Sequence, residues 1–152
     1  MPARFRSLVP VALLAASAAL AADQASLKIE YFKPAEVDAA RAAGEAGSPI
    51  ITNQEFKVIA ARRDKPGQSE IHVADTDIFV VIDGAATIVI GGKMIDAKEV
   101  SPGEIRGSGI EGGADYRLEK GVVLTVPRNT PHWVKQAQPG FRYFVVKSVA
   151  RG

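Results

Sequence analysis

The sequence predicts an all-β domain built from many short strands. Short apolar runs recur along most of the chain, and Gly, Pro or Asp-Gly separates them. The clearest hairpin signal is Asp83-Gly84, which joins the apolar runs 78–82 and 85–90. Neither run alternates cleanly between apolar and polar residues, so we expect both faces of these strands to be covered. A closed barrel or a two-sheet sandwich would meet these requirements.

Two elements are expected before the barrel. Residues 26–32 alternate apolar and charged side chains, which predicts an edge strand. Residues 34–43 are rich in alanine, begin with proline and are followed by Gly44, which predicts a short helix outside the barrel. The barrel itself is expected over about 50–149. Within it, the polar, glycine-rich segment 95–115 is the least regular part, and we interpret it as a long excursion of the kind that often forms a binding loop.

The first 21 residues, 1–21, have the features of an export signal. Arg4 and Arg6 give a basic start, an apolar run rich in Ala and Leu follows, and Ala19-Leu20-Ala21 fits a small-x-small cleavage site after Ala21. The apolar run is short for a membrane span, but an uncleaved anchor is the alternative. Cleavage would leave a mature chain of residues 22–152 in the periplasm or outside the cell.

Composition restricts the class of protein. The mature length is sufficient for a single domain with a hydrophobic core, and 47% of the residues are hydrophobic. The chain has no cysteine, which excludes disulfides, thiolate metal sites and a cysteine nucleophile. Without the two arginines of the signal, 17 basic residues face 17 acidic ones, so the sequence does not indicate a nucleic-acid-binding surface.

Four residues are candidates for a metal site. Glu70 and His72 are two positions apart, so on a strand they point to the same face. Asp77 could join them only if the chain turns at 74–76, where the composition suits a turn. The only other histidine in the chain, His132, lies in a second segment punctuated by prolines.

Each candidate also has a structural interpretation. Either histidine could be a hydrogen-bonded core residue, Glu70 a solvated strand end, and Asp77 a residue that caps a turn. Trp133 is expected to pack in the barrel, because adjacent strand residues face opposite ways.

Other polar residues could contribute to a pocket. Arg62 and Arg63 face opposite ways on a strand, so one of them could point into the barrel as an anion clamp, or both could belong to a solvated turn. Glu104, Arg106, Tyr116 and Arg117 could line a pocket mouth, but an exposed polar loop would explain them equally well. The sequence has no phosphate-binding loop, dinucleotide fingerprint, nucleophile elbow or H-E-x-x-H motif.

These residues resemble the first motif of the cupin superfamily, G-x5-H-x-H-x3-4-E-x6-G. Here it reads Glu70-x-His72-x4-Asp77-x6-Gly84, with the spacing kept, glutamate in place of the first histidine and aspartate in place of the glutamate. The opening glycine is missing from its expected place, although Gly67 lies nearby. Aspartate is one methylene shorter than glutamate, so Asp77 could fall short of an ion or reach it through water.

The second cupin motif, G-x5-P-x-G-x2-H-x3-N, also has a counterpart. It reads Gly121-x5-Pro127-x-Asn129-x2-His132-x3-Gln136, with intact spacing and two conservative departures. The resemblance covers residues 70–136, about half of the chain. Each motif alone is a weak indication of the family. Both motifs in the expected order, in a chain that is predicted to consist of short strands, are a more specific indication.

The resemblance implies a jelly-roll barrel of six to eight strands with one divalent metal ion, held by Glu70, His72, Asp77 and His132. Two imidazoles and two carboxylates suit iron, manganese, nickel or zinc, and fewer than six protein ligands would leave positions open for substrate. The expected function is that of an exported mononuclear metal cupin acting on a small organic molecule, as a dioxygenase, isomerase or lyase. The alternative is a cupin that binds or senses a small ligand without turnover. We also expect a homodimer.

Overall fold

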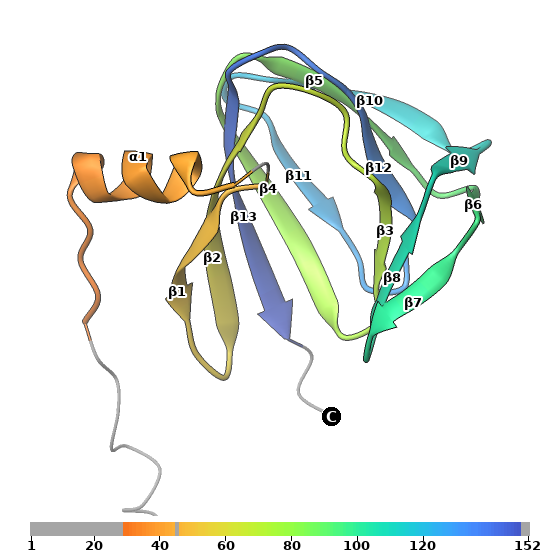
Figure 1. Ribbon diagram of the computed structural model, residues 1–152, viewed down its shortest axis with the longest axis horizontal. Helices are drawn as coiled ribbons and strands as arrows, with labels where there is room; N and C mark the ends of the chain where they lie inside the picture. The colour runs from red at the N-terminus through yellow and green to blue at the C-terminus, as the bar shows by residue number, and fades with distance from the viewer. Residues whose placement is uncertain (1–28, 45, 150–152) are drawn as a thin grey trace, which may run out of the picture. The chain divides into compact units, whose positions relative to one another are not determined.

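The computed structural model describes residues 29–44 and 46–149, and the elements below belong to one unit that begins at Tyr31 (Figure 1). The signal peptide expected at residues 1–21 lies outside the described residues. One α-helix and thirteen β-strands occur in the described part. They are α1 (Pro34–Ala42), β1 (Ser48–Thr52), β2 (Phe56–Arg63), β3 (Ser69–His72), β4 (Asp75–Asp83), β5 (Ala85–Ile90), β6 (Lys93–Ile95), β7 (Lys98–Ser101), β8 (Glu104–Gly107), β9 (Gly109–Glu111), β10 (Ala114–Glu119), β11 (Val123–Val126), β12 (His132–Ala137) and β13 (Phe141–Val149).

The strands form two large antiparallel sheets and one small one. The five-stranded sheet has the order β1-β2-β13-β4-β11, and the six-stranded sheet has the order β10-β5-β12-β3-β8-β7. Strands β6 and β9 pair with each other. Strands β2 to β5, and again β10 to β13, alternate between the two large sheets, so the chain winds back and forth in the jelly-roll manner (Figure 1). The all-β fold predicted from the short apolar runs is confirmed.

The core lies between the two large sheets. Its largest fully buried side chain is Phe141, at the start of β13, and Phe79 and Tyr143 stack against each other in the five-stranded sheet. Ile88 and Leu118, both 0% exposed, belong to the same cluster and come from the six-stranded sheet. Inward-facing positions of both sheets therefore share one core, which explains how a chain without disulfides holds its fold.

The turn at Asp83-Gly84 joins β4 to β5, as the sequence predicts. Gly84 has φ +74°, and a Cβ added there would lie 3.0 Å from the Cα of Phe141. Both the backbone conformation and the close approach of β13 therefore require glycine at this position.

Helix α1 confirms the helix expected after Pro34. Proline occupies the first turn, and Glu36 Oε2 accepts a 2.7 Å hydrogen bond from the backbone N–H of Lys33. The helix packs on β1 and β2, and the guanidinium of its buried Arg41 lies 4.8 Å from the ring centre of Phe144 on β13. This helix, the one helix in the described part of the chain, is too short to span a membrane.

The strand expected at 26–32 is not found in the part of it that the structure describes. Residues 29–33 have no regular secondary structure, and Ile29 and Tyr31 are 92% and 78% exposed. Alternation of apolar and charged residues predicts a strand only where a neighbouring strand supplies hydrogen bonds, and none of the described strands pairs with residues 29–33.

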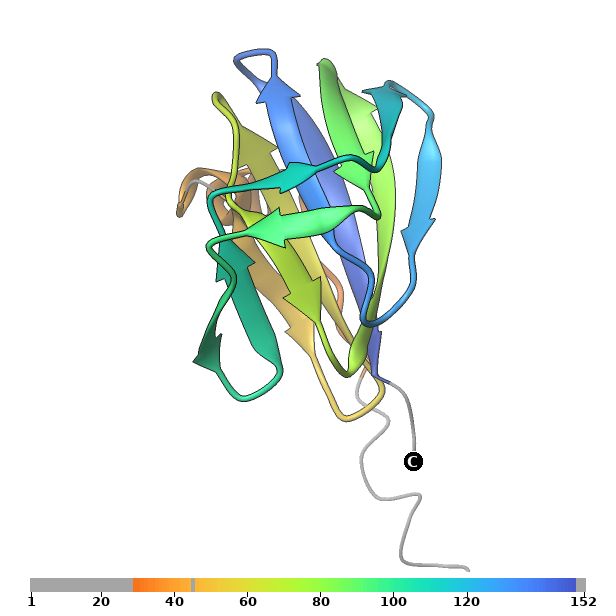
Figure 2. The same cartoon turned by 90° about the vertical axis from the view of Figure 1, so that its right-hand side faces the viewer.

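The excursion expected at 95–115 is also wrong in its secondary structure. This segment forms β7, β8 and β9 and contains the last residue of β6 and the start of β10. These strands help to bring the total in the described part to thirteen, more than the six to eight that the resemblance implies. The β7–β8 hairpin is nested inside the β6–β9 pair, as Figure 2 shows from the side. Strand β8 continues the six-stranded sheet by pairing with β3, which brings its side chains beside the candidate metal residues.

Candidate metal centre

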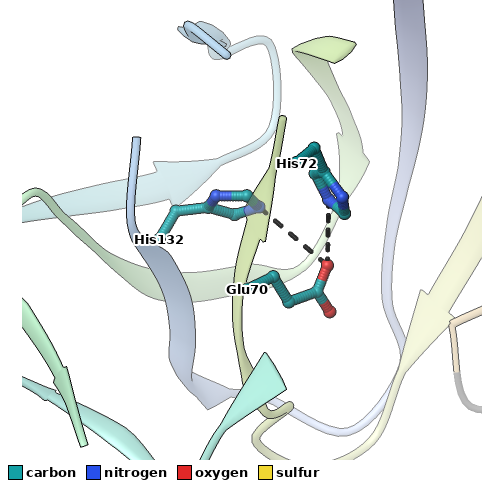
Figure 3. Close-up of side chains that lie close together, drawn as sticks. All are labelled: Glu70, His72 and His132. Atoms are coloured by element: carbon teal, nitrogen blue, oxygen red, sulfur yellow. Dashed lines mark ion pairs between the residues drawn. The ribbon is translucent and has the colours of Figure 1, made fainter. Parts of the chain in front are cut away.

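Cross-strand pairing brings three of the four candidate residues together. Glu70 and His72 lie on β3, and the register of β3 with β12 sets His132 directly opposite Glu70. Directly opposed residues of an antiparallel pair point to the same face, so all three side chains face the interior of the barrel (Figure 3). His72 and His132 are each 4% exposed.

Asp77 reaches the same region from the opposite sheet. After His72 the chain turns at Val73-Ala74, one or two residues earlier than expected, and β4 begins at Asp75. Asp77 Oδ2 lies 3.4 Å from His72 Nε2 and 3.7 Å from His132 Nε2. Both Asp77 oxygens also accept hydrogen bonds from Lys147 Nζ, at 2.8 and 3.1 Å. Asp77 is therefore held by an ion pair at the edge of the group.

The three residues Glu70, His72 and His132 form a group that could hold a metal ion, since one ligand atom from each lies within 4.8 Å of the others. Glu70 Oε2 is 3.2 Å from His72 Nε2 and 3.9 Å from His132 Nε2. Two ligands of one tetrahedral ion, each about 2.0–2.1 Å from it, are themselves about 3.3 Å apart. The observed spacing fits one ion bound by two imidazoles and one carboxylate.

His132 presents a free nitrogen to this group. Its Nδ1 lies 3.1 Å from the carbonyl oxygen of Thr130, and because a carbonyl only accepts, Nδ1 carries the hydrogen. Nε2 is then the unprotonated nitrogen that a metal requires. Burial, opposed by the Thr130 carbonyl and the nearby carboxylates, lowers the pKa of His132 and keeps the ring neutral.

The ring nitrogens of His72, unlike Nδ1 of His132, lack aligned hydrogen-bond partners among the described residues. Its Nδ1 is 2.8 Å from Glu104 Oε2, and its Nε2 faces Glu70 and Asp77, yet neither buried ring nitrogen is aligned for a hydrogen bond within the described residues. A buried polar nitrogen without an aligned partner is costly unless another ligand binds it. The unpaired Nε2, the nitrogen that faces the group, supports a cation there.

The ionised carboxylates around the group also favour the binding of a cation. Burial opposes ionisation of Glu70, but His72 and Arg106 outweigh it and lower the pKa of Glu70 to about 2. Burial likewise opposes the charge on His72, but Asp77 and Glu70 outweigh it and raise the pKa of His72 to about 9. The proton on His72 thus balances the carboxylates, and a divalent ion could take its place.

A cavity of about 370 Å³ opens onto the group. Strands of both large sheets line it, and Glu70, His72, Asp77 and His132 are all part of its wall. This volume falls in the range of sites for small molecules, which are roughly 300–1,000 Å³.

Sequence reasoning identified the ligand candidates but gave too little weight to β8. Opposite Glu70 on β8 lies Arg106, which donates a short hydrogen bond to Glu70 Oε1, and opposite His72 lies Glu104. The spacing Glu104-Ile105-Arg106 repeats the two-residue spacing of Glu70 and His72, a signal that could have marked a second inward-facing strand.

For Tyr116 and Arg117 the sequence leaves open a pocket mouth or an exposed polar segment; both are exposed on β10 and neither is part of the cavity wall. Trp133 packs among apolar residues and donates a 2.8 Å hydrogen bond to the Gly67 carbonyl, as expected for a packing residue.

The second motif keeps its geometry despite the replaced glycine. Asn129, where the cupin pattern has glycine, adopts φ +59°, and asparagine tolerates this left-handed conformation better than most residues. Its backbone N–H donates a 2.8 Å hydrogen bond to the His72 carbonyl, which ties the second motif to the first. The substitution is therefore conservative in structure as well as in sequence.

Comparisons with known proteins identify the fold. No protein-family model and no curated protein matches the chain, but solved structures do. Hydroquinone 1,2-dioxygenase from Sphingomonas sp. TTNP3 with 4-hydroxybenzoate bound gives a TM-score of 0.55 at 15% identity over 76% of this chain and 73% of that one. A Bacillus halodurans protein gives a TM-score of 0.55 at 11% identity, covering 80% and 83%.

A third structure, hydroquinone 1,2-dioxygenase PnpCD in complex with Cd²⁺ and 4-hydroxybenzonitrile, gives a TM-score of 0.50 at 14% identity and covers 68% of this chain and 63% of that one. Identities this low establish architecture alone. Together with the jelly-roll winding and the two motifs on β3–β4 and β11–β12, they show that this chain has a cupin-like fold.

Proposed function

We propose that this protein is a mononuclear metal-dependent enzyme that acts on a small organic molecule, by a dioxygenase, isomerase or lyase reaction. The observation that carries the proposal is the convergence of His72 Nε2, His132 Nε2 and Glu70 Oε2 at the wall of a cavity large enough for a substrate. The resemblance of the fold to two dioxygenase structures supports the same class.

The proposed ligand set leaves room for chemistry. Glu70, His72 and His132 would bind the ion, and Asp77 would be a fourth ligand or would hold Lys147 beside it. Structural zinc sites usually use four protein ligands, whereas catalytic sites keep a position open. Three ligands from β3 and β12 would leave such a position open and favour a catalytic site. A bound divalent ion supplies Lewis acidity and open coordination positions to a substrate in the cavity.

The surrounding residues would keep the ligands ready to bind. Arg106 fixes the orientation of Glu70 through a charge-assisted hydrogen bond, and Thr130 fixes the tautomer of His132. The rings of Phe79 and His132 pack in a T-shaped arrangement with 6.4 Å between their centres. Phe79 therefore limits access of water to that side of the group. The ligand atoms are therefore preorganised and partly shielded before any substrate enters.

Turnover by the metal-loaded protein tests the proposal. Protein loaded in turn with Fe²⁺, Mn²⁺, Ni²⁺ or Zn²⁺ would be incubated with a panel of small phenols, hydroxy acids and sugar acids, and substrate loss and oxygen uptake would be followed. We expect turnover with at least one metal, lost in His132→Ala and retained in Glu99→Ala, which changes an exposed carboxylate of β7. Saturable binding without turnover across the panel would favour the alternative, a cupin that binds or senses a ligand.

We also propose that the protein is exported, on the basis of the basic start, the apolar run and the Ala19-Leu20-Ala21 site in the sequence. Intact mass of the protein recovered from its native cells tests this. A chain that begins at Ala22 is expected, and a full-length chain in the cytoplasmic fraction would contradict it.

A further inference from the structure

We propose that the cavity takes a small organic anion and that Arg63 and Tyr143 bind its carboxylate. The inference rests on the proposed function, because it assigns a substrate class to the same cavity. Arg63 comes from the end of β2 and Tyr143 from β13, and both line the cavity into which the candidate metal group faces.

The charge balance of the cavity singles out Arg63. Four lysine and arginine side chains line it, Lys57, Arg63, Arg106 and Lys147, together with four carboxylates, Glu70, Asp75, Asp77 and Glu104. Arg106 and Lys147 form ion pairs with the carboxylates of the candidate metal group and its neighbours. No described carboxylate forms an ion pair with Arg63 or Lys57, so these two cations have no ion-pair partner within the described part of the chain. The carboxylates and the lysine and arginine side chains of the wall balance in number, so a divalent ion at the metal group would make the cavity positive, which favours an anionic ligand.

Arg63, unlike Lys57, is held in a fixed orientation. Its Nε donates a 2.8 Å hydrogen bond to Tyr143 Oη, whereas no side-chain hydrogen bond holds the Lys57 ammonium among the described residues. The guanidinium rests against Gly67: a Cβ added at Gly67 would lie 2.6 Å from Arg63 Nη1 and 2.9 Å from its Cζ. Only a residue without a side chain leaves this space to the guanidinium. With Nε occupied, the Nη groups remain as donors for a ligand in the cavity.

Tyr143 supplies a second donor at the same place. Since its Oη accepts the hydrogen bond from Arg63, its own O–H is available to donate to an anion. The residue is 2% exposed, and burial raises the pKa of Tyr143, so the hydroxyl stays protonated. An anion that accepts from both Arg63 and Tyr143 would be bound at two points, as the planar carboxylate group permits.

The anion position adjoins the candidate metal group through a layer of stacked rings. The ring of Tyr143 stacks on that of Phe79 with 5.6 Å between their centres. The rings of Phe79 and His132 form a T-shaped pair with 6.4 Å between their centres. A molecule whose carboxylate lies at Arg63 would therefore extend its reactive part along Phe79 toward the metal group. This placement distinguishes a substrate anchor from a stray surface charge.

Ligand selectivity of defined variants tests the inference. The probes are benzoate and its uncharged analogue benzamide, titrated calorimetrically into zinc-loaded protein. Because hydrogen bonds to charged groups contribute about 1.5–3 kcal/mol, the unmodified protein should prefer benzoate by roughly tenfold or more. Arg63→Gln should abolish this preference, and Gly67→Ala, which displaces the guanidinium without removing its charge, should reduce it. Arg62→Gln, the neighbouring arginine that pairs with exposed Asp64, should leave it unchanged.

The outcomes separate this inference from the proposed function. Equal binding of the two probes, failure of benzoate to bind, or a preference that survives Arg63→Gln would overturn the carboxylate anchor. Metal content, measured by elemental analysis on the same samples, should be one ion per chain in all four proteins. An anchor that fails in protein holding one ion per chain leaves the metal centre intact, whereas protein without metal refutes the proposed function whatever the probes do.

Discussion

After the proposed ligands, Glu104 is the residue whose position bears most directly on metal binding. Its Oε2 lies 2.8 Å from His72 Nδ1, the nitrogen that faces away from Glu70 and Asp77. The two groups are not aligned for a hydrogen bond, but a carboxylate behind a ligating imidazole generally orients the ring and increases its basicity. His72 therefore depends on a residue from β8, a strand that neither sequence motif includes.

Glu104→Gln should weaken metal binding without abolishing it. Loss of a carboxylate behind a ligating histidine typically costs about 10- to 100-fold in metal affinity. Competition with a chelator of known zinc affinity measures this change, and Glu99→Gln, on the neighbouring strand, is the matched control. Equal affinities for the two variants would show that the Glu104 contact is incidental.

The proton on His72 gives the metal-free protein a distinctive pH dependence. Its pKa of about 9 lies above the 6.5 of an ordinary histidine, because the carboxylates of Asp77 and Glu70 outweigh the effect of burial. The stabilisation from this raised pKa is complete below about pH 6.5 and is lost as the pH rises through 9, a decrease of about 2–3 kcal/mol.

Urea unfolding of metal-free protein between pH 6.5 and 9.5 measures this decrease, which should be absent in His72→Gln. In metal-loaded protein the ion replaces the proton, so the same pH range should produce a much smaller change. A flat profile for the metal-free protein would show that His72 is neutral, contrary to its acidic surroundings.

At the scale of the elements, the site depends on strand register. His132 faces Glu70 because β12 pairs with β3, and Arg106 faces Glu70 because β8 pairs with β3 from the other side. The loop before β12 is anchored at Asn129, whose N–H bonds to the His72 carbonyl. The conformation of that loop therefore helps to determine where His132 lies relative to Glu70 and His72.

Substitutions of Asn129 test whether the left-handed backbone conformation at this position is required for folding and metal binding. Asn129 has φ +59°, a conformation that glycine adopts freely, so Asn129→Gly should be neutral or slightly stabilising. Asn129→Val should lower the free energy of unfolding by about 1–2 kcal/mol and weaken metal binding. Thermal unfolding and metal titration of both variants provide the comparison. Equal stability of the glycine and valine variants would show that the left-handed conformation of the loop is not required.

Sequence reasoning worked where the signal was local. The hairpin at Asp83-Gly84, helix α1 and the shared face of Glu70 and His72 each follow from residues close together in the chain. The motif spacing also indicated that His132 would meet them. The strand predicted at 26–32 is not found in its described part, residues 29–32, because no described strand pairs with these residues and pairing partners are not encoded locally.

The segment 95–115 failed for a related reason. Its strands are three or four residues long and rich in polar residues, so they lack the apolar pattern that marks a strand. They form because β3 offers an edge for β8, and β8 in turn pairs with β7. Glu104 and Arg106 could be placed at the site only once this pairing was known.

At the scale of the whole molecule, one core supports both sheets. Phe141 is fully buried and stacks on Tyr143, with 4.8 Å between ring centres. Phe141→Ala should lower the free energy of unfolding by about 3–5 kcal/mol. Tyr116→Ala, an aromatic change at a 45% exposed position, is the control and should cost less than about 0.5 kcal/mol. Similar losses for the two variants in urea unfolding would contradict the assignment of the core.

The homodimer expected from the sequence stays a prediction. Light scattering of the metal-loaded protein should give twice the mass of the chain. A monomer at high concentration would contradict it, and would also mean that the outer faces of the strands are covered only by their own chain.

The central claim is that two histidines and a glutamate from neighbouring strands bind a single cation. Elemental analysis of protein loaded with Zn²⁺ and then freed of excess ion tests it most directly. One ion per chain is expected in the unmodified protein and in Glu99→Ala, with almost none in His72→Ala or His132→Ala when both variants keep the native circular dichroism spectrum. Metal-free unmodified protein, or the same metal content in the folded histidine variants, would contradict the account.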